Sequence, residues 1–168
     1  MTTGQPTRTA RVTRARVALA ATAALLAALD LGLKAWASGA LADGTSADLG
    51  VIQLRLTFNS GVAFSLGDTL PGWVVLGVTG LIVAGLAVFA WRKARTANLA
   101  VRLGLAAVLA GAIANLADRA ADGVVTDYLH TGWFPTFNLA DVFITVGGAV
   151  LVLASLRATD GTTRDSAP

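Results

Sequence analysis

Asp118 and Asp141 are the residues of this sequence whose type and surroundings best suit acid–base chemistry. Each lies at the end of a long apolar stretch, with Asn115 three residues before Asp118 and Asn138 three residues before Asp141. Two carboxylates held close together cannot both ionise easily, so the pKa of one rises and the pair shares a proton. The ionised member can take a proton from water while the protonated member donates to an amide. Such a pair can hydrolyse a peptide bond without a metal or a covalent nucleophile.

The composition excludes most other catalytic chemistries. The 168 residues include no Cys, a single His at position 130, and ten acidic residues that are all Asp. Thiol chemistry and thiolate metal sites are therefore excluded, and a zinc-binding pair of His is absent. The net charge is +3, but the basic residues sit at the ends of apolar runs and form no patch with aromatics. We expect no cofactor, no metal and no nucleic-acid partner.

Further polar groups interrupt the apolar sequence. Asp30 and Lys34 are one helical turn apart, so they share a helix face and can form an ion pair. Gly111, Asn115 and Asp118 follow i, i+4, i+7 spacing and form one stripe. Ionisable side chains in an apolar span are costly, and they usually face the interior of a helix bundle and serve a function.

Each of these residues also has a purely structural interpretation. Asp30 and Lys34 could only neutralise one another, and Asp118 could end a helix at the lipid headgroups. Asn138 and Asp141 could be an N-cap pair at the positive end of a helix dipole. These interpretations leave unexplained why the polar groups gather on one side.

For three more polar residues, the sequence favours a structural role over a functional one. Asn59 precedes Ser60-Gly61 and is typical of a turn. Asp127 reads as an exposed or locally turned residue, and His130 as a solvated residue of a loop.

Four apolar stretches must position these groups. They cover residues 16–37, 70–91, 97–117 and 138–156. Each reaches about 20 residues, enough to cross a hydrocarbon core of about 30 Å. Only 14% of the residues are charged, against about 25% in a soluble domain. The sequence therefore predicts an all-α integral membrane protein: one four-helix domain over residues 15–157, a basic tail over 1–14 and a polar, disordered tail over 158–168.

The distribution of Lys and Arg predicts the orientation. Both tails and the connection 92–97 are rich in basic residues, whereas the loops 38–69 and 118–137 contain only Arg55 and Arg119. Both termini are therefore expected in the cytoplasm. This topology places Asp30, Asp118 and Asp141 at similar depths near the outer interface.

The outward loops contain strand patterns. Apolar and polar residues alternate over 52–58 and again over 62–66, and residues 124–129 could be extended. A small extracytoplasmic β-sheet would suit an extended peptide, because a sheet edge can pair with a strand.

Four motifs, in order along the chain, resemble those of the lipoprotein signal peptidases (signal peptidase II). They are Asp-x-x-x-Lys at 30–34, Asn-x-Gly-x-Ala-Phe at 59–64, Asn-x-x-Asp-Arg at 115–119 and Phe-Asn-x-Ala-Asp at 137–141. Each is weak alone, but four in order on the expected elements are specific. The chain departs from the family pattern at Leu31, Ala114 and Tyr128, none of which removes a group that could do the chemistry.

The resemblance implies an intramembrane aspartyl endopeptidase of the bacterial cytoplasmic membrane, active near its extracytoplasmic face. It would remove signal peptides from diacylglyceryl-modified prolipoproteins on the N-terminal side of the lipidated Cys. The catalytic dyad would be Asp118 and Asp141. The residues ordering the site or binding substrate would be Asn59, Asn115, Arg119, Asn138, Ala140, Asp30 and Lys34. The expected partners are lipidated prolipoproteins and membrane lipids, and the chain is expected to be monomeric.

Two other functions remain open from the residues alone. A small proton-coupled transporter also places Asp inside helices, although its acidic site usually lies nearer the middle of the bilayer. A non-catalytic membrane scaffold would tolerate conservative changes at Asp118 and Asp141.

Overall fold

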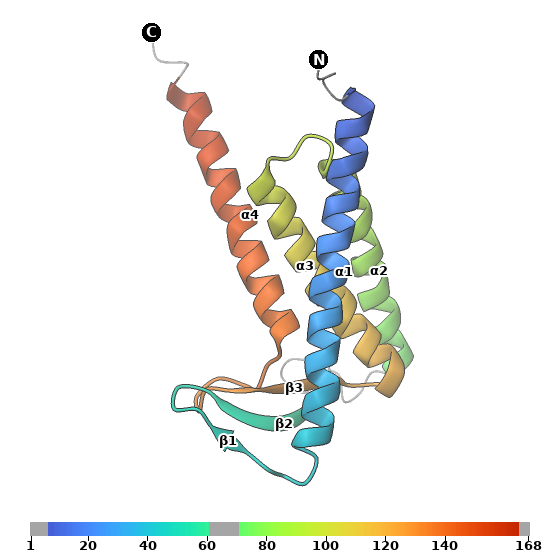
Figure 1. Ribbon diagram of the computed structural model, residues 1–168, viewed down its shortest axis with the longest axis vertical. Helices are drawn as coiled ribbons and strands as arrows, with labels where there is room; N and C mark the ends of the chain where they lie inside the picture. The colour runs from blue at the N-terminus through green and yellow to red at the C-terminus, as the bar shows by residue number, and fades with distance from the viewer. Residues whose placement is uncertain (1–6, 61–70, 165–168) are drawn as a thin grey trace, which may run out of the picture.

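The computed structural model describes residues 7–60 and 71–164, with side chains described as far as Arg157 in the last helix. These ranges contain the helices α1 (Arg8–Ala40), α2 (Gly72–Lys93), α3 (Leu99–Asp122) and α4 (Leu139–Arg164). They also contain the short strands β1 (Ala47–Asp48), β2 (Gln53–Asn59) and β3 (Val125–His130). All four helices are long and apolar enough to cross a membrane. The predicted fold class is confirmed, and the start of α1 and the end of α4 lie at the end of the bundle opposite the sheet (Figure 1).

Three helix ends lie five residues or more outside their predicted bounds. α1 begins at Arg8, where the Thr7 hydroxyl accepts a hydrogen bond from the Ala10 N–H (3.4 Å). Residues 8–14 of the predicted tail are thus helical, because Arg and Ala are strong helix formers. α4 likewise continues to Arg164, so the expectation of a disordered tail from residue 158 is wrong as far as that residue.

The end of α3 matters most for the site. The helix runs to Asp122 and stops at Gly123, whose φ of 77° is left-handed and whose N–H bonds to the Arg119 carbonyl (2.9 Å). Glycine adopts this conformation without steric cost and so closes the helix. Asp118 therefore lies one turn inside α3 and not in the predicted loop 118–137. Its carboxylate faces the bundle instead of the headgroups.

α3 is the central helix and packs against α1, α2 and α4. Small residues allow the close approach, since Ala106, Ala110 and Ala114 of α3 are fully buried. The contact with α4 is tighter still: a Cβ at Gly147 would lie 2.7 Å from the Gly104 carbonyl oxygen. Membrane helices associate through such small-residue packing, because burial of apolar surface gives no driving force in lipid.

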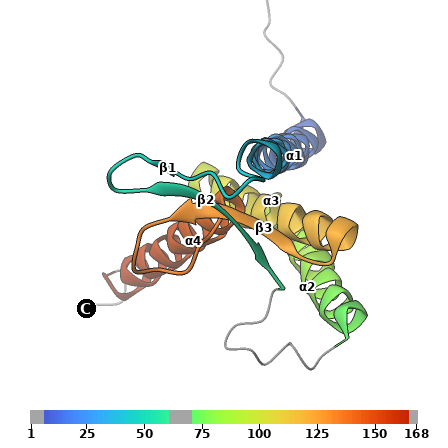
Figure 2. The same ribbon diagram turned by 90° about the horizontal axis from the view of Figure 1, so that it is seen from below.

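The sheet lies across one end of the bundle (Figure 2). Its strand order is β1-β2-β3, and both pairings are antiparallel. β2 and β3 occupy the stretches expected to be extended, whereas the two-residue β1 was not predicted. The predicted strand 62–66, and part of the motif at 59–64, lie outside the described residues. β3 follows α3 directly, and its Leu129 exchanges backbone hydrogen bonds with Phe137 just before α4.

The glycine contact gives a stability prediction. Gly147→Ala should destabilise the protein by about 1–3 kcal/mol, because the added methyl overpacks a rigid helix contact. The matched control is Gly148→Ala, where nothing lies within 4 Å of the added Cβ. The control should be neutral or slightly stabilising, since Ala is the better helix former. Thermal unfolding in detergent measures both, and equal midpoints for the two variants would contradict the proposed contact.

Candidate active site

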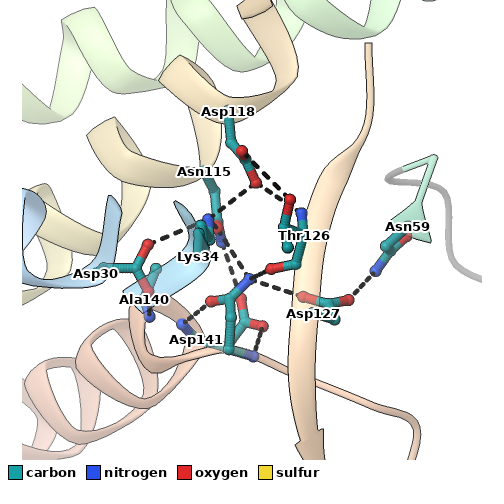
Figure 3. Close-up of polar contacts among 10 residues, drawn as sticks. Asp30, Lys34, Asn59, Asn115, Asp118, Thr126, Asp127, Ala140 and Asp141 are labelled. Carbon is teal, nitrogen blue, oxygen red and sulfur yellow. Dashed lines mark hydrogen bonds and ion pairs between the residues drawn. The ribbon is translucent and has the colours of Figure 1, made fainter. Parts of the chain in front are cut away.

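Lys34 is the hub of the polar site. Its ammonium is buried, with 2% of the residue exposed. It lies 3.1 Å from an oxygen of Asp30 and 3.3 Å from an oxygen of Asp118, and it donates to the Asn115 side-chain oxygen at 2.6 Å (Figure 3). The Asp30–Lys34 pair expected from spacing is present. The same cation also joins α1 to two positions on α3.

Asp30 carries the network to α4. One of its oxygens accepts a hydrogen bond from the Ala140 backbone N–H (2.8 Å), in the first turn of α4. The first N–H groups of a helix have no partner within the helix, and a carboxylate there also meets the positive end of the helix dipole. Asp30 and Ala140 are both fully buried. Ala140 thus takes part through its backbone.

Asn138 and Asp141 form a reciprocal cap at the start of α4. The Asp141 N–H donates to the Asn138 side-chain oxygen (3.0 Å), and the Asn138 N–H donates to Asp141 Oδ2 (3.2 Å). The structural interpretation of this pair therefore holds. Asp141 has a further partner, because the Asn115 amide donates to its Oδ1 (2.9 Å). Asp141 is only half-buried and borders a cavity.

Asp118 binds Lys34 and Thr126 rather than Asp141. Its Oδ2 accepts a hydrogen bond from the Thr126 N–H (2.6 Å) and lies near Lys34. The Thr126 hydroxyl approaches the other oxygen at 3.5 Å. Among the described residues, no contact joins Asp118 to Asp141. Asp118 thus fixes the start of β3 against α1 and α3.

Asp127 is the carboxylate that the sequence interpretation missed. It lies on β3 with 1% of the residue exposed. The Asn138 amide donates to its Oδ1 (2.7 Å), and the Asn59 amide donates to its Oδ2 (3.1 Å). Burial raises the pKa of Asp127 to about 6; the Asn59 hydrogen bond opposes the rise, and the charge of Asp141 adds to it. Its place in the middle of a predicted strand beside the bundle is the signal that could have found it.

Asn138 therefore contacts two carboxylates at once. Its side-chain amide binds Asp127, and its backbone N–H binds Asp141. Arg119 is half-buried on α3, and its guanidinium interacts electrostatically with Asp118, Asp127 and Asp141. The structure thus brings the predicted site residues together in one polar network that also includes Asp127.

A cavity of about 570 Å³ opens beside Asp141. It lies between the segment 131–137 and the outer face of α4, with Asn59 and Asp141 among its polar lining. Its apolar lining comprises Trp133, Phe134, Pro135, Phe137, Val142 and Val146. Within residues 7–60 and 71–164, no cluster of three or more His, Cys, Asp or Glu is placed to hold a metal. The cavity thus joins an apolar wall to a carboxylate.

Comparison with known proteins decides the family. The family model described as signal peptidase (SPase) II matches residues 22–157. The chain belongs to the signal peptidase II family. The lipoprotein signal peptidase of Sinorhizobium fredii is 40% identical over 116 residues, 67% of this chain and 69% of that one. The lipoprotein signal peptidase of Bartonella tribocorum is 34% identical over 148 residues, 84% of this chain and 88% of that one.

Solved structures agree on the fold. A bacterial membrane enzyme solved at 2.3 Å resolution matches with a TM-score of 0.73 and 22% identity, over 86% of this chain and 90% of that one. As a member of the signal peptidase II family, the chain is a multi-pass bacterial membrane protein with a role in processing lipoprotein signal peptides. Family membership favours the peptidase over the transporter and the scaffold.

The raised pKa of Asp127 predicts a pH-dependent stability. The folded protein holds this proton more tightly than the unfolded chain, whose Asp titrates near 3.8. The stabilisation is therefore complete below pH 4 and is lost as the pH rises towards about 6. Its size is up to roughly 3 kcal/mol. Asp127→Asn should flatten the unfolding free energy between pH 4 and 6 relative to the parent protein, and parallel pH profiles would refute the assignment.

The Lys34 hub gives a second stability prediction. Lys34→Met should cost about 3–5 kcal/mol, because it leaves Asp30 and Asp118 buried without their cation. Adding Asp30→Asn should recover part of the loss, because one of the uncompensated charges is then removed. Chemical denaturation of the single and double variants tests this. A double variant less stable than Lys34→Met would contradict the proposed charge balance.

Proposed function

We propose that this protein is an aspartyl endopeptidase that cleaves diacylglyceryl-modified prolipoproteins on the N-terminal side of the lipidated Cys. Family membership supports the substrate class, and the polar site supports the type of chemistry. The observation that carries the proposal is the bridge made by Asn138 between the carboxylates of Asp127 and Asp141. It holds Asp127 next to Asp141, which lines the cavity, and such an acid pair needs neither a metal nor a covalent nucleophile.

The contacts favour Asp127 over Asp118 as the partner of Asp141. Asp118 forms an ion pair with Lys34 and accepts a hydrogen bond from the Thr126 N–H, so its carboxylate stabilises the fold. Among the described residues, the hydrogen-bond donors to Asp127 are the side-chain amides of Asn59 and Asn138, and the charge of Asp141 acts on it. With a pKa of about 6, Asp127 can gain or lose a proton near neutral pH. The proposed dyad is therefore Asp127 and Asp141.

Each acid then has a role in hydrolysis. Asp141 accepts hydrogen bonds from the Asn115 amide and the Asn138 N–H, surroundings that suit an ionised carboxylate and thus the general base that activates water. Asp127, whose burial favours the protonated form, donates its proton to the carbonyl oxygen as the water adds, which gives a gem-diol. The C–N bond then breaks as the proton that Asp141 took from water passes to the leaving nitrogen and Asp127 takes a proton back from a gem-diol hydroxyl.

The cavity and the membrane together define the substrate. The apolar cavity next to Asp141 suits the apolar signal-peptide residues beside the scissile bond. The positive-inside rule puts this end of the bundle at the extracytoplasmic face, because the basic residues gather at the opposite end. Acyl chains that stay in the bilayer would hold the lipidated Cys at the depth of the dyad. β2, which carries Asn59, offers an extended segment beside the peptide.

Three matched variants test the proposed dyad. Asp127→Asn and Asp141→Asn should each lower the cleavage rate by roughly 10²–10⁴-fold, the usual contribution of a general acid or base. Asp118→Asn should keep much more activity, because an amide oxygen can still accept the Thr126 hydrogen bond. The measurement is the release of signal peptide from a diacylglyceryl-modified prolipoprotein by purified protein.

Thermal unfolding of the same variants separates chemistry from folding. A folded and inactive Asp118→Asn beside an active Asp127→Asn would restore the dyad predicted from the sequence. Full activity of Asp141→Asn would exclude any acid pair that includes this residue.

A further inference from the structure

A second cavity lies at the end of the bundle opposite the catalytic site. It has a volume of about 370 Å³ and lies between the start of α1 and the start of α3, helices that pack side by side (Figure 1). This volume is within the range of about 300–1,000 Å³ that is typical of ligand sites. The polar side chains that line it are chiefly basic: Arg11, Arg14 and Arg102. We refer to this cavity as the arginine groove.

The wall of the arginine groove is apolar. It is formed by Ala15, Ala18, Leu19, Leu99, Leu103 and Ala106. Ala18 and Leu103 are exposed, so the groove is open to the surroundings of the helices. Both helices are long and apolar enough to span a membrane, so this open side faces lipid acyl chains. The groove therefore combines cationic groups with a surface that only hydrocarbon can cover.

The electrostatics of the groove favour an anion. Among its described lining residues, none is acidic. The first turn of α3 contributes Leu99 and Arg102, so the positive end of that helix dipole adds to the charge. The Arg102 Nε is buried and has no hydrogen-bond partner among the described residues. A buried donor of this kind is costly unless a partner satisfies it.

We propose that the arginine groove binds an anionic phospholipid of the cytoplasmic leaflet. The headgroup phosphate accepts hydrogen bonds from Arg14 and Arg102, and the acyl chains run along the apolar wall towards Ala18 and Leu103. Basic pockets between helices at the cytoplasmic side are suited to such headgroups. The positive-inside rule assigns this end of the bundle to the cytoplasm. The bound lipid braces the contact of α1 with α3, the same helices that Lys34 joins nearer the sheet.

The apolar wall distinguishes this groove from the other basic concavities at the same end. Those concavities have a single apolar lining residue, Val12, and they lack the run of Ala and Leu. Their other lining residues are Arg8, Thr9, Thr13, Arg16, Arg92, Arg95 and Thr96. A free phosphate has no apolar part, so contact with that wall would add nothing to its binding free energy. Charge and apolar surface together therefore select a lipid.

The test uses the purified full-length protein titrated with phosphatidylglycerol in detergent. Native mass spectrometry gives the dissociation constant, and fluorescence-detected unfolding gives the lipid-induced shift in midpoint. Arg14→Gln/Arg102→Gln should weaken binding roughly thirtyfold, the contribution expected of two arginines near anionic lipid. The matched control, Arg92→Gln/Arg95→Gln, removes the same charge outside the groove and should bind like the parent protein.

A steric variant tests the apolar wall separately. Ala18→Trp keeps every arginine but fills the groove from an exposed position. It should fold normally and bind phosphatidylglycerol at least about tenfold more weakly, equivalent to 1.4 kcal/mol. Phosphatidylcholine and inorganic phosphate serve as probes of the two parts of the ligand.

Three results would each overturn the proposal. The first is equal binding by the groove and control double variants. The second is binding of phosphatidylcholine as tight as that of phosphatidylglycerol. The third is a shift in unfolding midpoint with inorganic phosphate alone that matches the shift with lipid. Because none of the altered residues contacts the dyad, cleavage of a prolipoprotein in detergent should stay unchanged in all these variants.

Discussion

The architecture of the site depends on one constraint: a buried ammonium must be matched by carboxylates inside a low-dielectric bundle. Lys34 meets this requirement with Asp30 and Asp118. Each of these acids then binds a backbone N–H of another element, Ala140 in α4 and Thr126 in β3. The cation thereby fixes α1, α3, β3 and the start of α4 relative to one another. Removing one of these charged side chains leaves another charge buried without a partner. The free-energy cost of that unpaired charge exceeds the net stabilisation that the complete network provides.

The acids of the site divide according to their neighbours. Asp30 and Asp118 face Lys34, and their charge balances that cation. Asp127 and Asp141 instead receive hydrogen bonds from neutral amide groups and border each other through Asn138. The acids beside Lys34 serve the charge balance of the bundle, whereas an acid bound by neutral amides remains available to exchange a proton. Identical side chains therefore serve structure or chemistry according to their surroundings, as in other sites that run acid and base steps together.

Local spacing predicted much of this arrangement. The Asp30–Lys34 pair, the cap formed by Asn138 and Asp141 and the spans themselves follow from helical periodicity. The proposed acidic partner of Asp141, which is Asp127, did not follow from periodicity, because its position depends on how β3 folds back across the bundle. The neighbouring residues Thr126 and Asp127 of β3 are both buried. The alternation of apolar and polar residues along the sequence therefore gave no indication of which side chain faces the site. The extra turn of α3, which directs Asp118 inwards, depended on the stop at Gly123.

The relative position of the proposed dyad residues also depends on the close packing of helices within the bundle. Gly111 of α3 lies against the carbonyl of Ala140, so closely that any side chain at position 111 would displace the first turn of α4. That turn carries the N–H bonded to Asp30 and the Asp141 carboxylate bonded to Asn115. A small shift of α4 would therefore break contacts on both sides of the helix start. Hydrogen bonds set the orientation of the acids, but the absence of a side chain at Gly111 sets the distance of the α4 start, and with it Asp141, from α3.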